Sequence, residues 1–85
     1  MTPEGAMPLP MLPEGAQAQI VEVRAGRRLK ERLAGLGLHA GAQVRILRDN
    51  GGPLLLAIGD TRLALGRGMA HKILVQPVPT EVSRL

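Results

Sequence analysis

The sequence predicts a mainly β domain, a small barrel of five strands with one short α-helix after the first strand. Several short runs alternate aliphatic and polar residues and are separated by glycine or proline, which is typical of strands in a small sheet. Only one run, residues 27–36, repeats its leucines with helical spacing. The chain has no Phe, Tyr or Trp, so aliphatic side chains must fill the core, and they suit the narrow interior of a small barrel.

A chain of 85 residues has room for a single domain, which we expect to span residues 16–77. Residues 1–15 are rich in proline and glycine and predict a flexible arm. Within this arm, Leu9 and Leu12 are the side chains placed to pack across one end of the core. Residues 78–85 predict a polar tail.

Residues 17–24 predict the first strand, in which Ala18 and Ile20 alternate toward the interior. Val23 breaks this alternation, because it lies three residues after Ile20. A β-bulge near Val21–Glu22 would restore the pattern, as the strands of small barrels often need.

Residues 27–36 predict a helix that must dock on the sheet, because about ten residues form only a marginal helix alone. An apolar stripe runs along it at spacing i, i+4 and i+7, formed by Leu29, Leu33 and Leu36. Gly37 is placed to adopt the left-handed conformation that commonly ends a helix. Leu38 follows at the position where a hydrophobic contact back onto the helix is usual.

Four further strands are expected after the helix, near residues 42–48, 54–58, 61–65 and 73–77. Between the first two of these, Asp49–Pro53 predicts a hairpin turn, because Asn and Gly tolerate a positive φ. Gly66–His71 predicts a loose turn or a short 3₁₀ segment before the closing strand.

The net charge of +4 comes from one short segment, residues 24–32. Five basic side chains there surround one acid, Glu31: they are Arg24, Arg27, Arg28, Lys30 and Arg32. A local basic patch of this kind steers a protein toward an acidic partner or toward phosphates. A solvated helix face is the alternative interpretation for most of these side chains.

The sequence lacks the residue patterns that enzymes need. It has no cysteine and no glycine-rich phosphate loop, and its one serine, Ser83, lies in the tail, so no nucleophile–base pair can be assembled. We therefore expect a binding module and not an enzyme. No stretch approaches the roughly 20 apolar residues that span a bilayer, and the first residues lack the basic region of a signal peptide, which predicts a soluble cytoplasmic protein.

The two histidines, His39 and His71, lie 32 positions apart, and neither has a carboxylate at ligand spacing. We therefore expect no required cofactor. A weakly held divalent ion, zinc or ferrous iron, would bind where two chains share a site, with His39 or His71 beside a carboxylate. A weak homodimer is part of this prediction. The alternative interpretation of both residues is an exposed turn histidine without a ligand.

An ordered set of leucines and glycines surrounds the predicted helix end: Leu33, Leu36, Gly37, Leu38, Gly41 and Val44. Downstream follow Gly52–Pro53, Arg62–Leu65 and Ile73–Pro77. Together these segments resemble the signature of the ferrous iron transport protein A (FeoA) family, and the resemblance covers roughly residues 9–77. Two loops depart from the family pattern: the turn Asp49–Pro53 is shorter, and Gly66–Gly68 replaces a more helical, charged segment.

The resemblance implies a five-stranded SH3-like barrel, similar to the C-terminal domains of metal-dependent repressors. It also implies an accessory role beside the FeoB membrane transporter, which carries ferrous iron and has a cytosolic GTPase domain.

We expect the partner to dock where the predicted helix ends, because this part most resembles the family signature and the net charge lies on the adjacent helix. The helix end and its turn are expected to leave a shallow apolar cleft against the barrel, with the candidate docking residues Leu29, Leu36, Gly37, Leu38 and Met69. Arg27, Arg28 and Arg32 would set the partner's approach. A turn with a purely structural role is the alternative interpretation.

Two other functions fit parts of the sequence. A nucleic-acid-binding barrel is favoured by the pI near 11.2 and the basic helix, but the chain offers no aromatic side chain for base stacking. A metal-sensing domain related to repressor C-terminal domains fits the implied fold. The main prediction is a regulatory adaptor that docks on a GTPase or transporter.

Overall fold

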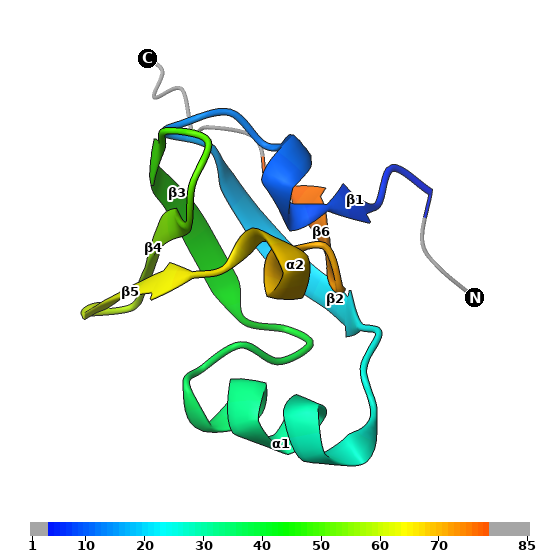
Figure 1. The fold of residues 1–85 in the computed structure, drawn as a ribbon. Coiled ribbons are helices and arrows are strands. Elements are labelled where there is room, and N and C mark those ends of the chain that lie inside the picture. The colour runs from blue at the N-terminus through cyan, green and yellow to red at the C-terminus, as the bar shows by residue number, and fades with distance from the viewer. Residues whose placement is uncertain (1–3, 79–85) are drawn as a thin grey trace.

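Residues 4–78 are described in the computed structural model of the chain, which Figure 1 shows as a ribbon. Six strands form one antiparallel sheet in the order β1-β6-β2-β3-β4-β5. The strands are β1 (Met7–Pro8), β2 (Gln17–Val23), β3 (Gln43–Asp49), β4 (Leu54–Ile58), β5 (Thr61–Leu65) and β6 (Ile73–Pro77). The other elements are a 3₁₀ turn, η1 (Leu9–Met11), and two helices, α1 (Arg27–Gly35) and α2 (Arg67–Ala70). The mainly β class with a helix after the first long strand is confirmed.

β1 is a sixth strand that the sequence does not predict, and it lies in the segment expected as a flexible arm. Met7 of β1 pairs with Val75 of β6. Leu9 is fully buried and Leu12 nearly so, which confirms their expected packing. The segment 1–15 is therefore paired and packed from Met7 to Leu12, because the two leucines fill one end of the core and hold this stretch against β6.

The remaining strands follow the predicted boundaries closely. β2 contains the expected bulge, where its register with β6 shifts between Ile20 and Glu22, and the shift returns Val23 to the core. A second shift occurs between Ile46 and Arg48 of β3. This second bulge was not predicted, although the alternation of Val44 and Ile46 also breaks here, because the charged Arg48 stands where an unbroken strand would turn its next side chain inward.

Aliphatic side chains alone make up the core, as the composition predicts. The largest of the fully buried side chains are Leu9, Ile20, Leu33, Leu38, Ile46, Leu54, Leu56, Ile73 and Val75. Among residues 4–78, no polar or charged residue is buried. The charged groups of this part of the chain are therefore all at or near the surface.

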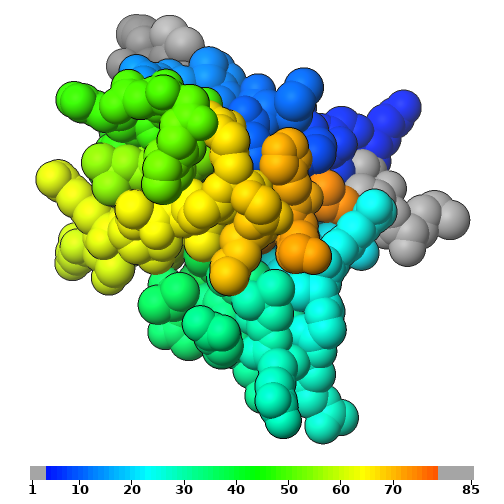
Figure 2. Space-filling model, viewed as in Figure 1, coloured from blue at the N-terminus to red at the C-terminus, as the bar shows by residue number. Residues whose placement is uncertain are grey.

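α1 projects from the body of the barrel, as both the ribbon and the space-filling view show (Figures 1 and 2). Leu33 holds it in place and is 1% exposed, whereas Leu36 is 51% exposed, so the predicted stripe packs at its centre and not at its end. The helix ends in a Schellman motif, in which the Leu38 N–H donates to the Leu33 carbonyl (2.8 Å) and the Gly37 N–H to the Ala34 carbonyl (2.9 Å). This motif brings Leu38 into the same core cluster as Leu33.

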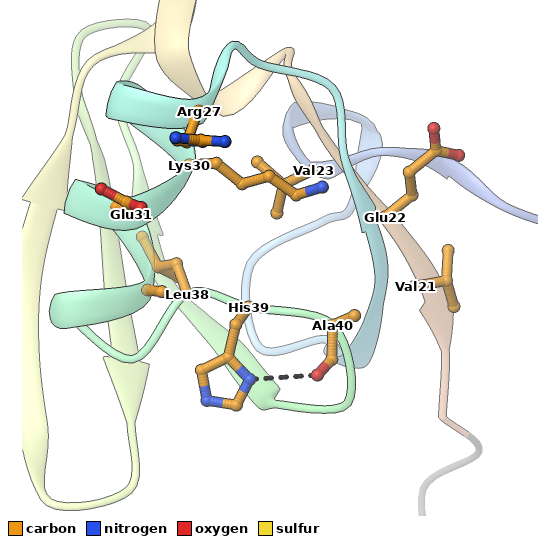
Figure 3. Close-up of a pocket in the computed structure, with 10 residues that line it drawn as sticks. Val21, Glu22, Val23, Arg27, Lys30, Glu31, Leu38, His39 and Ala40 are labelled. Atoms are coloured by element: carbon orange, nitrogen blue, oxygen red, sulfur yellow. Dashed lines mark hydrogen bonds between the residues drawn. The ribbon is translucent and has the colours of Figure 1, made fainter.

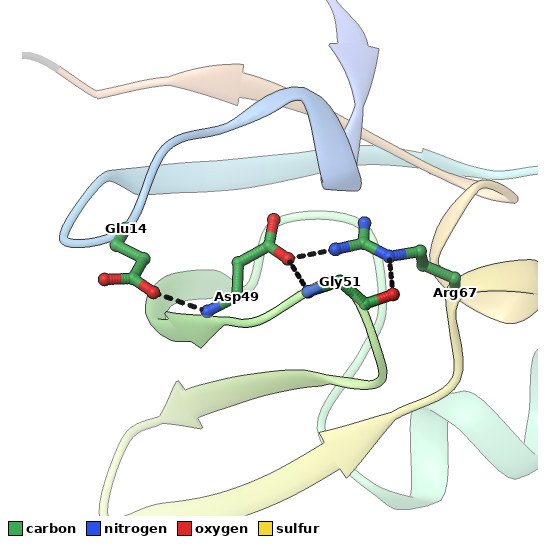
Figure 4. A network of polar contacts seen from close by, with 4 residues as sticks. All are labelled: Glu14, Asp49, Gly51 and Arg67. Carbon is green, nitrogen blue, oxygen red and sulfur yellow. Dashed lines mark hydrogen bonds and ion pairs between the residues drawn. The ribbon is translucent and has the colours of Figure 1, made fainter.

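A polar network fixes α2, which replaces the loose turn or 3₁₀ segment predicted for Gly66–His71 (Figure 4). Arg67 pairs with Asp49 at the end of β3, and its Nε donates to the Gly51 carbonyl oxygen at 3.2 Å. An Asp49 carboxylate oxygen accepts the Gly51 N–H at 3.1 Å, which holds the predicted hairpin turn. Glu14 joins from the loop before β2, where its carboxylate accepts the Asp49 N–H at 2.8 Å.

The predicted polar tail 78–85 lies outside the described residues except for Val78, whose N–H donates to the Gln17 carbonyl oxygen at 2.9 Å. None of the helices within residues 4–78 is long and apolar enough to cross a membrane.

Candidate partner-docking groove

A hollow of about 340 Å³ lies between α1, the end of β2 and the turn that follows α1 (Figure 3). We call it the α1–β2 groove. Its walls are Arg27, Lys30, Glu31 and Ala34 from α1, Val21, Glu22 and Val23 from β2, and Leu38, His39 and Ala40 from the turn.

The helix wall of the groove follows from helical spacing. Arg27, Lys30, Glu31 and Ala34 fall at i, i+3, i+4 and i+7, so they share one face of α1. A neighbouring face turns Leu33 into the core. The helix can therefore pack on the barrel and still present this second face to the groove.

The strand wall of the groove is an open sheet edge. The first residues of β2, Gln17–Gln19, pair with β3 on one side and β6 on the other. Beyond Ile20, β2 pairs with β6 alone, because the chain leaves the sheet to form α1 before it returns as β3. Such an edge offers backbone donors and acceptors to another chain.

The groove combines an apolar floor with a charged rim. Buried Leu38 and Val23 lie at its base, and half-buried Val21 and exposed Ala34 supply accessible apolar surface in its walls. Figure 3 shows Arg27, Lys30 and Glu31 on the helix, across the groove from the β2 residues. Two cations and one acid on this rim leave the helix side positively charged.

The predicted steering arginines are all on α1. Arg27 lines the groove, and Arg28 and Arg32 are exposed on the helix outside the lining. Within residues 4–78, none of the three forms an ion pair. Their charges are therefore available to an approaching partner.

The predicted apolar docking residues do not form one cleft. Leu38 is fully buried, because the Schellman motif turns it inward, so it is not an exposed anchor. Leu29 on α1 and Met69 on α2 are half-buried against the core and lie outside the groove lining. Leu36 stays exposed at the helix end. Gly37 has φ +94°, which confirms its predicted left-handed conformation.

Sequence reasoning missed most of the groove. Lys30 and Ala34 were within reach, because helical spacing places them on the face of Arg27. The open strand edge at Val21 and Val23 could not be predicted from the sequence. It depends on how far β3 pairs along β2, and no local sequence pattern encodes the length of that pairing.

The two histidines lie in different parts of the molecule, and only His39 lines the α1–β2 groove. His39 lines the groove, and its Nδ1 donates to the Ala40 carbonyl oxygen at 3.0 Å, which leaves Nε2 for another partner. His71 is exposed at the end of α2 and does not line the groove. In the described part of the chain, no three residues among His, Cys, Asp and Glu come together.

Solved structures share this fold. A crystal structure of an iron uptake regulatory protein (FeoA) matches with a TM-score of 0.81 at 27% identity, covering 86% of this chain and 99% of that one. FeoA of Stenotrophomonas maltophilia, solved with zinc and described as an SH3 domain protein, matches with a TM-score of 0.74 at 33% identity, covering 82% and 89%. A manganese-dependent transcriptional repressor matches with a TM-score of 0.77 at 23% identity, covering 92% of this chain and 44% of the repressor, and shares the fold. The SH3-like fold is confirmed.

Sequence comparisons agree with the structural ones. A candidate Fe(2+) transport protein A of Methanocaldococcus jannaschii is 30% identical over 69 residues, which cover 81% of this chain and 84% of that protein. The FeoA domain model matches residues 7–77, from the start of β1 to the end of β6. The match therefore spans every element of the described fold, and the chain belongs to the FeoA family.

Proposed function

We propose that this chain is an accessory protein of ferrous iron transport that acts in the cytoplasm by docking on the GTPase region of a FeoB-type membrane transporter. Membership of the FeoA family supports the transport role. One observation supports the docking proposal: the α1–β2 groove places an open strand edge beside a cationic helix and an apolar floor. We take this role to be regulatory, because the groove fits the docking of another protein segment.

The open edge favours a partner segment in extended conformation. A strand added beside β2 beyond Ile20 would satisfy backbone groups on both chains, as in β-augmentation. An aliphatic side chain of that segment would meet Val23 and the floor of the groove. Leu36, exposed at the end of α1, would add a second apolar contact.

The charge of α1 favours an acidic partner surface. Arg27, Arg28 and Arg32 are exposed and without ion pairs in the described chain, so they attract acidic groups before contact is made. Charges at a rim mainly set the association rate and its salt dependence, whereas apolar contacts in the floor set the dissociation rate. The two parts of the groove are therefore separable by kinetics.

Replacing Arg27, Arg28 and Arg32 together with Gln is expected to slow association with the transporter by roughly tenfold at low salt, with dissociation little changed. Surface plasmon resonance with the FeoB-type transporter in lipid nanodiscs measures both rates. Ala34→Gln should do the opposite: a longer neutral side chain narrows the groove, so the complex should dissociate faster at an unchanged association rate.

The matched control is a second triple variant, Arg45→Gln, Arg48→Gln and Arg62→Gln, which removes the same charge from the sheet. It should associate like the unmodified protein. Equal slowing by both triple variants would show that net charge, and not the helix, drives association. Wild-type kinetics for the helix triple variant and for Ala34→Gln would place the docking surface elsewhere.

We further propose that any zinc or ferrous iron bound by this chain is held weakly between two copies, by His39 or His71 with a carboxylate. The zinc in the Stenotrophomonas maltophilia FeoA structure and the absence of a three-residue cluster within residues 4–78 support this proposal. Sedimentation velocity should show a zinc-dependent dimer that weakens in His39→Ala or in His71→Ala. Calorimetry that finds one stoichiometric, submicromolar site on the monomer would contradict it.

A further inference from the structure

The exposed face of the sheet carries a row of four residues that runs straight across four strands. Gln17 of β2 pairs with Arg45 of β3, Arg45 pairs with Ala57 of β4, and Ala57 pairs with Arg62 of β5. Residues paired across a sheet point to the same face. The small Ala57 therefore separates two arginines that project on the same side.

A second hollow, of about 460 Å³, lies over this row and is lined by all four of its residues. Gln43 and Leu47 of β3 also line it, and no acidic residue does. Two strand spacings set the Cα atoms of Arg45 and Arg62 about 9.5 Å apart. At that separation both long side chains can lean over Ala57 toward one point.

Neither arginine is neutralised by the protein. Within residues 4–78, no ion pair or hydrogen bond involves the guanidinium of Arg45 or of Arg62. Asp60 is the acid nearest to Arg62 in sequence, but it lies in the turn between β4 and β5 and outside the hollow. Two unpaired guanidinium groups beside one concave surface concentrate positive potential there.

We propose that this hollow binds the phosphate group of a small ligand, with Arg45 and Arg62 closing on it from opposite sides of Ala57. The placement of the two guanidinium groups favours a phosphate over a carboxylate. A carboxylate has two oxygens and satisfies one guanidinium fork, whereas a phosphate has oxygens enough for two forks at once. The side-chain amides of Gln17 and Gln43 can donate to remaining oxygens.

The ligand class is a phosphate monoester or pyrophosphate compound of low molecular weight. The hollow has the volume of a small-molecule site, and Leu47 supplies apolar surface beside the cations. The row ends at β5, the edge of the sheet, and does not continue as a track that a nucleic-acid backbone could follow. The site shares no residue with the α1–β2 groove, so it stands independently of the proposed docking.

The test is a titration of the full chain with sodium pyrophosphate at constant ionic strength, followed by ¹⁵N-¹H NMR. We expect saturable shifts concentrated at the amides of Arg45, Ala57 and Arg62. Arg45→Gln and Arg62→Gln should each weaken binding by about tenfold or more, the loss expected for one charge-assisted pair. Ala57→Glu should abolish binding, because it places a carboxylate between the two guanidinium groups.

Two controls carry the same changes in charge elsewhere. Arg28→Gln removes one exposed arginine from α1, and Ala34→Glu adds one acid to α1; both should bind pyrophosphate within about twofold of wild type. The dispersion of the NMR spectrum shows whether each variant is folded. If Ala57→Glu does not fold, the affinities of Arg45→Gln and Arg62→Gln for pyrophosphate test the proposal.

Three results would overturn the proposal. The first is a set of shifts spread evenly over α1 and the sheet. The second is equal weakening by Arg28→Gln and Arg45→Gln. The third is tight binding of a single-stranded oligonucleotide that pyrophosphate does not displace, which would assign the cations to nucleic acid.

Discussion

Leu33 and Leu36 lie three residues apart on one helix stripe, yet only Leu33 reaches the core. α1 ends at Gly35, and Leu36, with φ −92° and ψ 0°, has already left helical geometry. Periodicity predicts which side chains share a face, but it does not say how far that face stays in contact with the sheet. For this reason the sequence places Leu33 correctly in the core and Leu36 incorrectly in the packed stripe.

Leu33→Ala is expected to lower the free energy of unfolding by about 2–5 kcal/mol, because it empties a buried site that joins the helix to the barrel. Leu36→Ala, at an exposed site on the same helix, should change it by less than about 0.5 kcal/mol. Urea unfolding followed by far-UV circular dichroism measures both, since the chain has no aromatic fluorophore. A loss below about 1 kcal/mol for Leu33→Ala would show that α1 is peripheral.

The end of α1 was predictable from the sequence, whereas the groove beside it was not. The glycine that ends the helix and the leucine that folds back onto it are local signals, and the structure confirms both. The bulge in β2 was equally predictable. Val23 lies three residues after the inward-facing Ile20, and both can face the core only if the strand contains one extra residue. The α1–β2 groove needs two elements at once, and its open edge exists only because β3 pairs with half of β2.

Two glycines two positions apart on this element should respond oppositely to alanine. Gly37→Ala is expected to destabilise the fold by about 1–3 kcal/mol, because φ is +94° and a Cβ there would lie 3.1 Å from Ile58 Cγ2. Gly35→Ala should stabilise it by up to about 1 kcal/mol, since Gly35 is helical and a Cβ meets nothing within 4 Å. Thermal unfolding of both variants tests this. Equal effects would mean that the Schellman geometry does not persist in solution.

Pairing between strands from the two ends of the described chain adds β1 at one edge of the sheet. β1 is two residues long, too short for any alternation to reveal, and it lies among prolines that predict an arm. Its partner β6 is distant in sequence, so only tertiary structure shows that the two belong together. Composition predicted an all-aliphatic core, and Leu9 and Leu12 were rightly assigned to one end of it.

Leu9→Ala is expected to cost about 2–5 kcal/mol of unfolding free energy, as large as a loss from the centre of the barrel, because Leu9 is fully buried. Met11→Ala, in the same 3₁₀ turn but 67% exposed, should cost less than about 0.5 kcal/mol. Chemical denaturation of the pair measures whether residues 7–12 belong to the cooperative fold. A negligible effect of Leu9→Ala would make this stretch a dispensable arm.

The place of β6 in the sheet has a consequence for how the protein is made. Among the strands of residues 4–78, β6 is the last to leave the ribosome, yet it lies between β1 and β2, the first two. Met7 and Val75, which pair across this seam, are 68 positions apart. The nascent chain therefore cannot join β1 to β2 until β6 has been synthesised, and until then the flank of β2 that β6 covers stays open to other chains. A product that stops before Ile73 would lack the strand that joins its own beginning to the rest of the sheet.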